Sequence, residues 1–147
     1  MVDDMIGANS KQIVISIQPK WAGLIRSGEK TVELRRRFPR LPAGAVAYLY
    51  ESTPTRAVTA LLHLGIVQEL PVAELWISHG KASCVDQDYF NQYFAGRDVG
   101  FGIHITRCVP LSANLPLAEL RQRFAFIAPQ SWAYATPELI AAARVFP

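Results

Sequence analysis

The charged side chains best suited to chemistry in this sequence are Lys30, Glu33 and Arg35, which lie within six residues of one another. Hydrolysis of an amide needs a group that activates water, a proton donor for the leaving amine and donors directed at the developing oxyanion. Glu33 could activate the water, and Lys30 could stabilise the oxyanion or pass a proton. Ser131 or Tyr50 could add further hydrogen bonds. This chemistry requires neither a metal nor another cofactor, and we expect none.

Residues 31–37 (TVELRRR), which contain this group, alternate in polarity. Such alternation is typical of a β-strand that presents opposite faces to different surroundings. Val32 and Leu34 are expected on an apolar face. A cross-strand row of ion pairs without catalytic function would give the same pattern and remains the alternative. The other face is expected to carry Thr31, Glu33, Arg35 and Arg37.

The positive charge of the chain is concentrated in residues 20–40. The whole chain has 15 basic and 12 acidic residues, a net charge of +3, whereas this segment alone has seven basic residues and two acidic ones. The asymmetry indicates that one face meets an anion, of which phosphate is the commonest biological example. A solvated basic strand edge that opposes aggregation is the other interpretation.

The remaining pattern predicts a mixed α+β fold. Strands are expected at residues 12–18, 31–37, 45–50, 57–69 and 99–109, because these segments alternate or are rich in β-branched residues. Helices are expected to begin at Pro19, at Pro71, after Asp86, at Pro116 and after Thr136. This order lacks the regular alternation of a doubly wound parallel sheet. A small, partly closed β-barrel flanked by helices fits it better.

Two details of the helices are part of this prediction. The helix after Pro71 is expected to end at His79 and Gly80. The aromatic residues of the next helix recur at helical spacing and are expected to pack together in the core. These residues are Tyr89, Phe90, Tyr93 and Phe94.

A chain of 147 residues suits one domain, which we place at residues 12–147 after a flexible N-terminal segment, residues 1–11. No uncharged stretch approaches the roughly 20 apolar residues of a membrane span, so no membrane partner is expected. The first ten residues lack the basic start and apolar run of a secretory signal. The expectation is therefore a cytoplasmic protein whose two cysteines are reduced.

Four segments, in order, resemble the ASCH domains of the PUA-like superfamily of small β-barrels. The first is a G-x-K-x-x-E-x-R pattern that begins at Gly28. The others are residues 50–56 (YESTPTR), 93–97 (YFAGR) and 129–132 (PQSW). The resemblance implies a PUA-like barrel with polar motif residues in a cleft, directed at a nucleobase or RNA.

Some small ASCH proteins are amidohydrolases that remove acyl groups from N4-acylated cytosine, cytidine or deoxycytidine through a lysine, a threonine and a glutamate. In this sequence the lysine falls on Lys30, and the threonine position holds Glu33. Thr31 and Ser131 are candidate substitutes for the threonine. The family glutamate has no residue assigned to it here.

A longer ASCH type has been associated with ribonuclease activity through a tyrosine, a lysine and a serine, and other members are proposed RNA-binding regulators. The three positions fall on Tyr50, Arg56 and Ser131. Arginine binds phosphate well but does not exchange protons, so an acid role for Arg56 does not follow.

The leading hypothesis is an amidohydrolase acting on an N4-acylated cytosine base or nucleoside. The alternative is an RNA-binding module or a ribonuclease, with single-stranded RNA as the partner. Whether Lys20 or Lys30 is the principal lysine stays open. The candidate catalytic residues are Lys30, Glu33, Ser131 and Lys20. The candidate substrate-binding residues are Tyr50, Arg35, Arg56, Trp132 and Thr31, where Trp132 could stack on a base.

Overall fold

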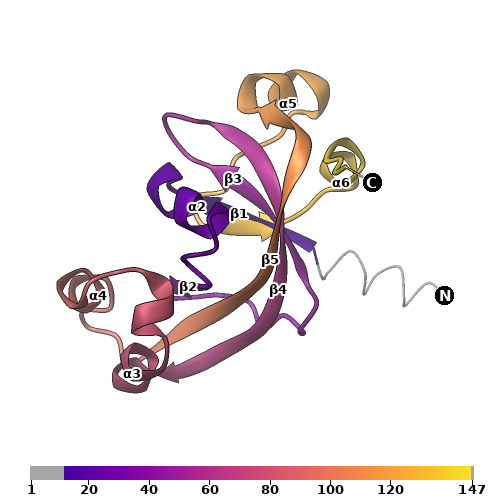
Figure 1. Ribbon diagram of the computed structural model, residues 1–147. Helices are drawn as coiled ribbons and strands as arrows, with labels where there is room; N and C mark the ends of the chain where they lie inside the picture. Colours follow the sequence, from indigo (N-terminus) through magenta and orange to yellow (C-terminus); the bar gives the residue numbers. More distant parts are fainter. Residues whose placement is uncertain (1–11, 147) are drawn as a thin grey trace.

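The computed structural model describes residues 12–146, which form a six-stranded sheet curled into a half-barrel (Figure 1). The strand order is β2-β5-β4-β3-β1-β6, and all neighbours are antiparallel except β1 and β3. Register shifts along β4 and β5 bend these two long strands, which is how an antiparallel sheet acquires its curl. The strands are β1 (Gln12–Ile17), β2 (Val32–Arg35), β3 (Val46–Glu51), β4 (Ala57–Pro71), β5 (Val99–Pro116) and β6 (Trp132–Tyr134).

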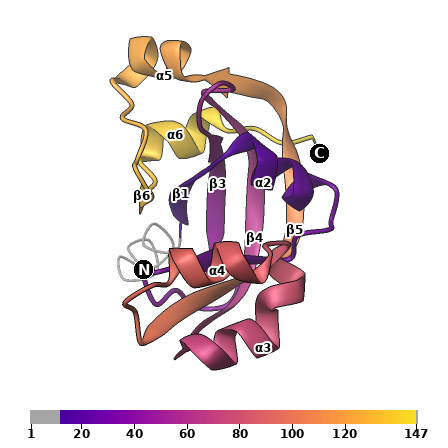
Figure 2. The ribbon, with the colours of Figure 1, turned by 90° about the vertical axis from the view of Figure 1, so that its left-hand side faces the viewer.

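Five helices occur in residues 12–146, and they lie at the ends and on both sides of the sheet. Helices α3 and α4 sit together at the end that carries β2, whereas α5 lies at the opposite end (Figures 1 and 2). Helix α2 packs over the strands between these two groups. The helices are α2 (Pro19–Arg26), α3 (Val72–Ser83), α4 (Gln87–Tyr93), α5 (Leu117–Phe124) and α6 (Pro137–Ala142).

The packing of β2 determines where its charged side chains point. Val32 and Leu34 lie in a buried cluster with Leu75 of α3 and Phe90 of α4. Because successive side chains of a strand point to opposite faces, Glu33 and Arg35 are directed away from this cluster. The predicted alternation of β2 is therefore confirmed, although both of its faces are covered and all four strand residues are buried.

The α+β class and the curled barrel-like sheet are confirmed, whereas some element limits were wrong. The strand predicted over residues 31–37 is only Val32–Arg35, so Arg37 lies beyond its end. Strand β5 continues through Pro110 to Pro116, and the short strand β6 was not predicted at all. β6 has only three residues and forms by pairing with β1, a long-range contact that local periodicity does not reveal. The N-terminal segment predicted to be flexible lies outside the described residues.

The predicted end of a helix at His79 and Gly80 was also wrong, because α3 continues to Ser83. Both residues are buried against the sheet rather than exposed at a helix end. A Cβ atom on Gly80 would lie only 2.5 Å from Cε3 of Trp76. The glycine therefore leaves space for the indole ring and does not end the helix. Helix α3 therefore reaches Ser83, whose carbonyl oxygen accepts a hydrogen bond from Lys30, just before β2.

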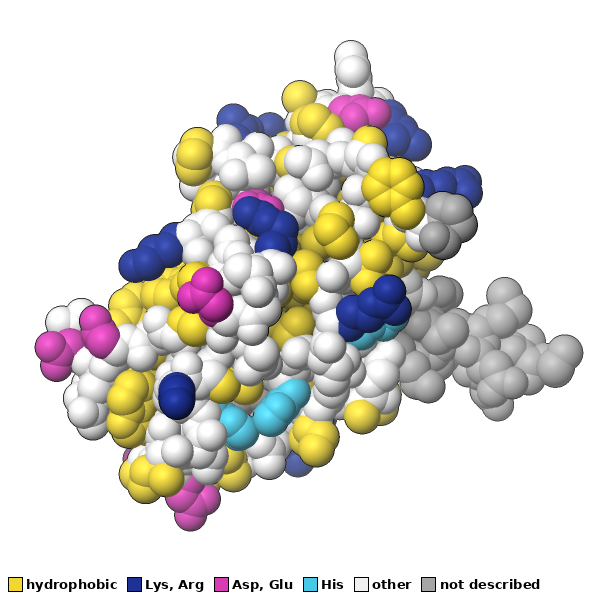
Figure 3. All heavy atoms as spheres, viewed as in Figure 1, with side chains coloured by type: hydrophobic (Ala, Val, Ile, Leu, Met, Phe, Trp, Pro, Cys, Tyr) yellow, Lys and Arg dark blue, Asp and Glu magenta, His cyan; other side chains and the backbone are white. Residues whose placement is uncertain are grey.

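A histidine pair fastens α3 to the sheet. Nε2 of His79 lies 2.7 Å from Oε1 of Gln68, and Nε2 of His104 lies 3.2 Å from the same atom. The two imidazole rings meet edge to face with centroids 4.8 Å apart (histidines are cyan in Figure 3). Burial lowers the pKa of His79, and the neighbouring His104 lowers it further. The folded protein thus favours a neutral His79.

We predict that the folded state loses stability as the pH falls from about 8 to about 5. A histidine whose pKa is lower in the folded state binds protons more readily when unfolded, so acid below the unfolded pKa of about 6.5 favours unfolding. The midpoint of thermal unfolding, followed by circular dichroism, should fall over this range. In His79→Gln the fall should be smaller, and an equal fall in both proteins would contradict the assignment.

Candidate functional site

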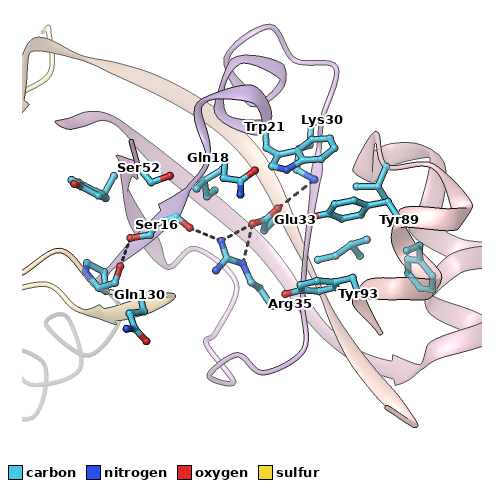
Figure 4. Close-up of a pocket in the computed structure, with 16 residues that line it drawn as sticks. Ser16, Gln18, Trp21, Lys30, Glu33, Arg35, Ser52, Tyr89, Tyr93 and Gln130 are labelled. Carbon is cyan, nitrogen blue, oxygen red and sulfur yellow. Dashed lines mark hydrogen bonds and ion pairs between the residues drawn. The ribbon is translucent and has the colours of Figure 1, made fainter. Parts of the chain in front are cut away.

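A cavity of about 410 Å³ opens between β2, α2, α4 and the loop that precedes β6 (Figure 4). Its charged side chains come from β2 and, for Lys30, from the segment that joins α2 to β2. Gly28 has a φ of 83°, a left-handed conformation that lets the chain turn out of α2. The backbone N–H of Lys30 then donates to the carbonyl oxygen of Leu24 at 3.0 Å, which fixes the start of the strand.

The floor of the cavity is a buried network of two cations around one carboxylate. Nε and Nη2 of Arg35 donate to Oε2 of Glu33 at 2.9 and 2.7 Å. Nζ of Lys30 lies 3.3 Å from Oε1 of Glu33 and donates to the carbonyl oxygen of Ser83 at 2.7 Å. The Lys30 side chain is only 2% exposed. The hydrogen bond to Ser83 uses one of its three hydrogens, and the other two are left for Glu33 or a ligand.

Arg35 also joins three segments that are distant in the sequence. Its Nη2 donates to the carbonyl oxygen of Ser16 in β1 at 2.8 Å, and its Nη1 donates to Oγ of Ser131 at 3.0 Å. Ser16 in turn donates through Oγ to the carbonyl oxygen of Pro129 at 2.5 Å. The loop that carries Ser131 is therefore held against the charged floor.

Aromatic side chains form the walls. The rings of Trp21 and Tyr89 meet at a centroid distance of 5.5 Å, and Tyr89 stacks on Tyr93 at 6.2 Å. Burial raises the pKa of Tyr89, and Tyr93 and Glu33 raise it further, while Trp21 and Arg35 act in the opposite direction. Its hydroxyl is therefore a neutral hydrogen-bonding group. Aromatic walls above a floor with charged donors and acceptors suit a flat, polar heterocycle.

The structure brings most of the predicted residues together. Lys30, Glu33, Arg35 and Tyr50 line the cavity, and Ser131 lies at its edge through its bond to Arg35. The parallel register that pairs Ser16 with Tyr50 explains how Tyr50 reaches this position. Hydrogen bonds and ion pairs connect Lys30, Glu33, Arg35 and Ser131. Tyr50 is only 5% exposed, and its ring packs near Phe126 in a buried cluster.

The other candidates lie outside this lining. Lys20 is exposed, with its ammonium 4.6 Å from the centroid of the Trp21 ring. Thr31 and Arg56 are also exposed, and Arg56 lies in the turn between β3 and β4. Trp132 packs beside Phe38 at a centroid distance of 6.2 Å. Lys30, rather than Lys20, is the lysine that reaches the cavity.

Several lining residues were not predicted. The expectation that all four aromatic residues of α4 enter the core holds only for Phe90 and Phe94, which are both 2% exposed. Tyr89 and Tyr93 face the cavity instead. Both members of this pair carry a hydroxyl, a signal that could have separated them from the phenylalanines. The other polar and aromatic lining residues that were missed are Ser16, Gln18, Trp21, Ser52 and Gln130.

Residues 12–146 hold no metal-ligand cluster and no helix that could span a membrane. No group of three or more His, Cys, Asp or Glu side chains in this range is placed to hold a metal ion. None of the helices in the same range has the length and apolar character that crossing a bilayer requires.

Comparison with known proteins gives a consistent set of relatives. The ASCH domain family is matched over residues 15–106. The chain is also similar to an ASCH domain-containing ribonuclease of Zymomonas mobilis, with 33% identity over 88 residues. That match covers 60% of this chain and spans only 60% of the length of the relative.

Solved structures agree over more of the chain. The crystal structure of ASCH from Zymomonas mobilis has a TM-score of 0.83 and 28% identity, and the match covers 92% of this chain and 97% of that one. Two variants of that protein, one with a serine replaced by alanine and one with a tyrosine replaced by phenylalanine, each give a TM-score of 0.82. The N-terminal domain of Staphylothermus marinus McrB shares the fold alone, at 15% identity, a TM-score of 0.58 and coverage of 90% and 92%.

We predict that Glu33→Gln lowers the free energy of unfolding by about 3 kcal/mol, because it leaves Lys30 and Arg35 buried without their shared carboxylate. Urea denaturation measures the change. The matched control is Glu119→Gln, which removes a carboxylate from an exposed pair with Arg123 at 3.6 Å and should cost less than about 1 kcal/mol. Equal losses in the two variants would mean that the floor network does not stabilise the fold.

Proposed function

Because the chain belongs to the ASCH domain family, we propose that it binds single-stranded RNA and cleaves it, with one unstacked base in the aromatic cavity. Protein sites that hold single-stranded bases commonly combine aromatic faces for stacking with polar groups directed at the base edge. Trp21 and Tyr89 provide the faces, and Lys30 and Glu33 provide a donor and an acceptor. The similar protein from Zymomonas mobilis that is named a ribonuclease supports this choice.

The observation that carries the proposal is that Tyr50 and Ser131 both border the aromatic cavity. Tyr50 lines the cavity, and Ser131 accepts a hydrogen bond from Arg35 at its edge. The two residues have the same separation along the chain as the tyrosine and serine that were replaced in the Zymomonas mobilis variants. This agreement supports Tyr50 and Ser131 as the groups that act on the substrate.

Cleavage of an RNA strand requires proton transfer and stabilisation of the negative charge on the reacting phosphate. In our proposal the ribose 2′-hydroxyl attacks the adjacent phosphorus and the 5′-oxygen leaves with a proton from the Tyr50 hydroxyl. Solvent takes up the proton of the 2′-hydroxyl and returns one to Tyr50. Ser131 donates a hydrogen bond to the phosphate while Arg35 holds the serine oxygen. Arg56 occupies the position where the resemblance has a lysine. A guanidinium stays charged, so Arg56 attracts phosphate without exchanging a proton.

We predict that Tyr50→Phe lowers the cleavage rate of a single-stranded RNA by about 100-fold, which is typical for loss of a proton-transfer group. Ser131→Ala should also slow cleavage, because it removes the hydroxyl that Arg35 positions. The rates are measured on denaturing gels with end-labelled RNA. Tyr134→Phe, on the exposed part of β6, is the matched control and should keep the wild-type rate. Wild-type rates in Tyr50→Phe and Ser131→Ala would overturn these roles.

A second candidate function is removal of the acyl group from an N4-acylated cytosine base or nucleoside. The observation that favours it is the Lys30 and Glu33 pair at the floor of a cavity of about 410 Å³, which has room for a nucleoside. Arg35 occupies Oε2 of Glu33, so Oε1 is the atom that would direct a water molecule. Lys30 would stabilise the oxyanion.

If this second function is correct, the protein converts N4-acetylcytidine to cytidine, and Lys30→Met abolishes the conversion because the donor to the oxyanion is lost. Chromatography of the nucleosides measures the reaction. Lys20→Met is the matched control, since Lys20 lies outside the cavity lining. Absence of cytidine in the presence of RNA cleavage would exclude this candidate and leave the ribonuclease.

A further inference from the structure

A second cavity, of about 370 Å³, adjoins the aromatic one and is lined largely by arginines. Arg35 and Tyr93 line both cavities, so the two form one continuous surface. Arg35 is paired with Glu33. Among residues 12–146, no carboxylate takes part in the lining of the second cavity, which consists of Arg35, Arg36, Arg37, Tyr93, Arg97 and Ser131.

The three further arginines have no partner of opposite charge in the part of the chain that is described. Within residues 12–146, no ion pair involves Arg36, Arg37 or Arg97. Cations gathered on one concave surface repel one another and raise the local positive potential. A bound anion relieves that repulsion, so the second cavity has the character of an anion site.

The planar shape of the guanidinium groups favours phosphate as the bound anion. Guanidinium groups match the oxygen geometry of phosphate and can donate two hydrogen bonds to it. Arg36 lies against the ring of Tyr93 with its guanidinium carbon 4.8 Å from the centroid, which limits its freedom before a ligand arrives. The same tyrosine forms a wall of the aromatic cavity.

We propose that Arg36, Arg37 and Arg97 form a seat for the phosphate of the RNA strand whose base occupies the aromatic cavity. This inference rests on the proposed function and specifies its substrate as a polynucleotide strand. A nucleotide joins its base to its phosphate through a single ribose, so the two ligand groups must lie in adjoining sites. Ser131 lines the phosphate seat and is bonded to Arg35, so the reacting phosphate meets the group to which we assign chemistry.

The test is the affinity for a fluorescently labelled single-stranded RNA octamer, measured by fluorescence anisotropy over a series of NaCl concentrations. The Tyr50→Phe background is used to keep the strand intact, which a gel verifies. Arg36→Gln, Arg37→Gln and Arg97→Gln are compared with Arg121→Gln. Arg121 is an exposed arginine of α5 outside both cavities, so this control removes the same charge elsewhere.

Each variant of the seat should reduce the slope of log affinity against log salt by about 0.7, the value for one phosphate contact to a single strand. At about 0.1 M salt this corresponds to about fivefold weaker binding. Arg121→Gln should keep the wild-type slope. Slopes in the three seat variants that equal the slope of the control would overturn the proposal.

Two further measurements separate this proposal from the proposed function. If the seat variants lose slope but the protein with Tyr50 intact does not cleave RNA, the phosphate seat stands and the ribonuclease fails. If cleavage is normal and the slopes do not change, the ribonuclease stands and the seat fails. Competition by inorganic phosphate or nucleoside monophosphates as strong as that by the octamer would overturn the assignment to a strand.

Discussion

The guanidinium group of Arg35 is the interaction on which the rest of the site depends. It donates to a carboxylate on its own strand, to a carbonyl oxygen of β1 and to the hydroxyl of Ser131. Two of these acceptors lie far from β2 in the strand order, because β2 is at one edge of the sheet and β1 lies next to the other edge. The curl of the sheet closes that gap (Figure 1). A planar donor with fixed geometry then sets the positions of all three segments relative to one another.

The consequences for binding follow from this arrangement. Glu33 is held between Arg35 and Lys30, and helix α3 contributes the carbonyl oxygen that fixes the Lys30 ammonium. A charged floor that is already ordered needs little rearrangement when a ligand arrives, and the loss of entropy on binding is smaller for that reason. The aromatic residues of α2 and α4 enclose the floor from the sides (Figure 4). The cavity and the arginine-lined surface beside it thus form a pair of adjoining sites with different chemistry.

Local sequence patterns predicted those features that depend on neighbouring residues. The alternation in residues 31–37 placed Glu33 and Arg35 on one face, because a single strand determines that arrangement. The four matching segments pointed to the fold of the ASCH family, and the family match and the solved structures confirm it. The roles of individual residues, in contrast, stay predictions.

Features set by long-range pairing were missed, among them β6 and the approach of Ser16 to Tyr50. The prediction for helix α4 was partly wrong for a related reason. One side of the helix faces the core and the adjacent side faces the cavity, so its phenylalanines are buried while its tyrosines line the cavity.

The central claim is that one base of an RNA strand lies in the cavity walled by Trp21, Tyr89 and Tyr93, above the Lys30 and Glu33 pair. The most direct measurement is a crystal structure of the Tyr50→Phe variant with a short single-stranded RNA. The account predicts one base unstacked from its neighbours in the aromatic cavity, with its edge hydrogen-bonded to Lys30 and Glu33. An RNA strand bound elsewhere on the molecule, with this cavity empty, would contradict it.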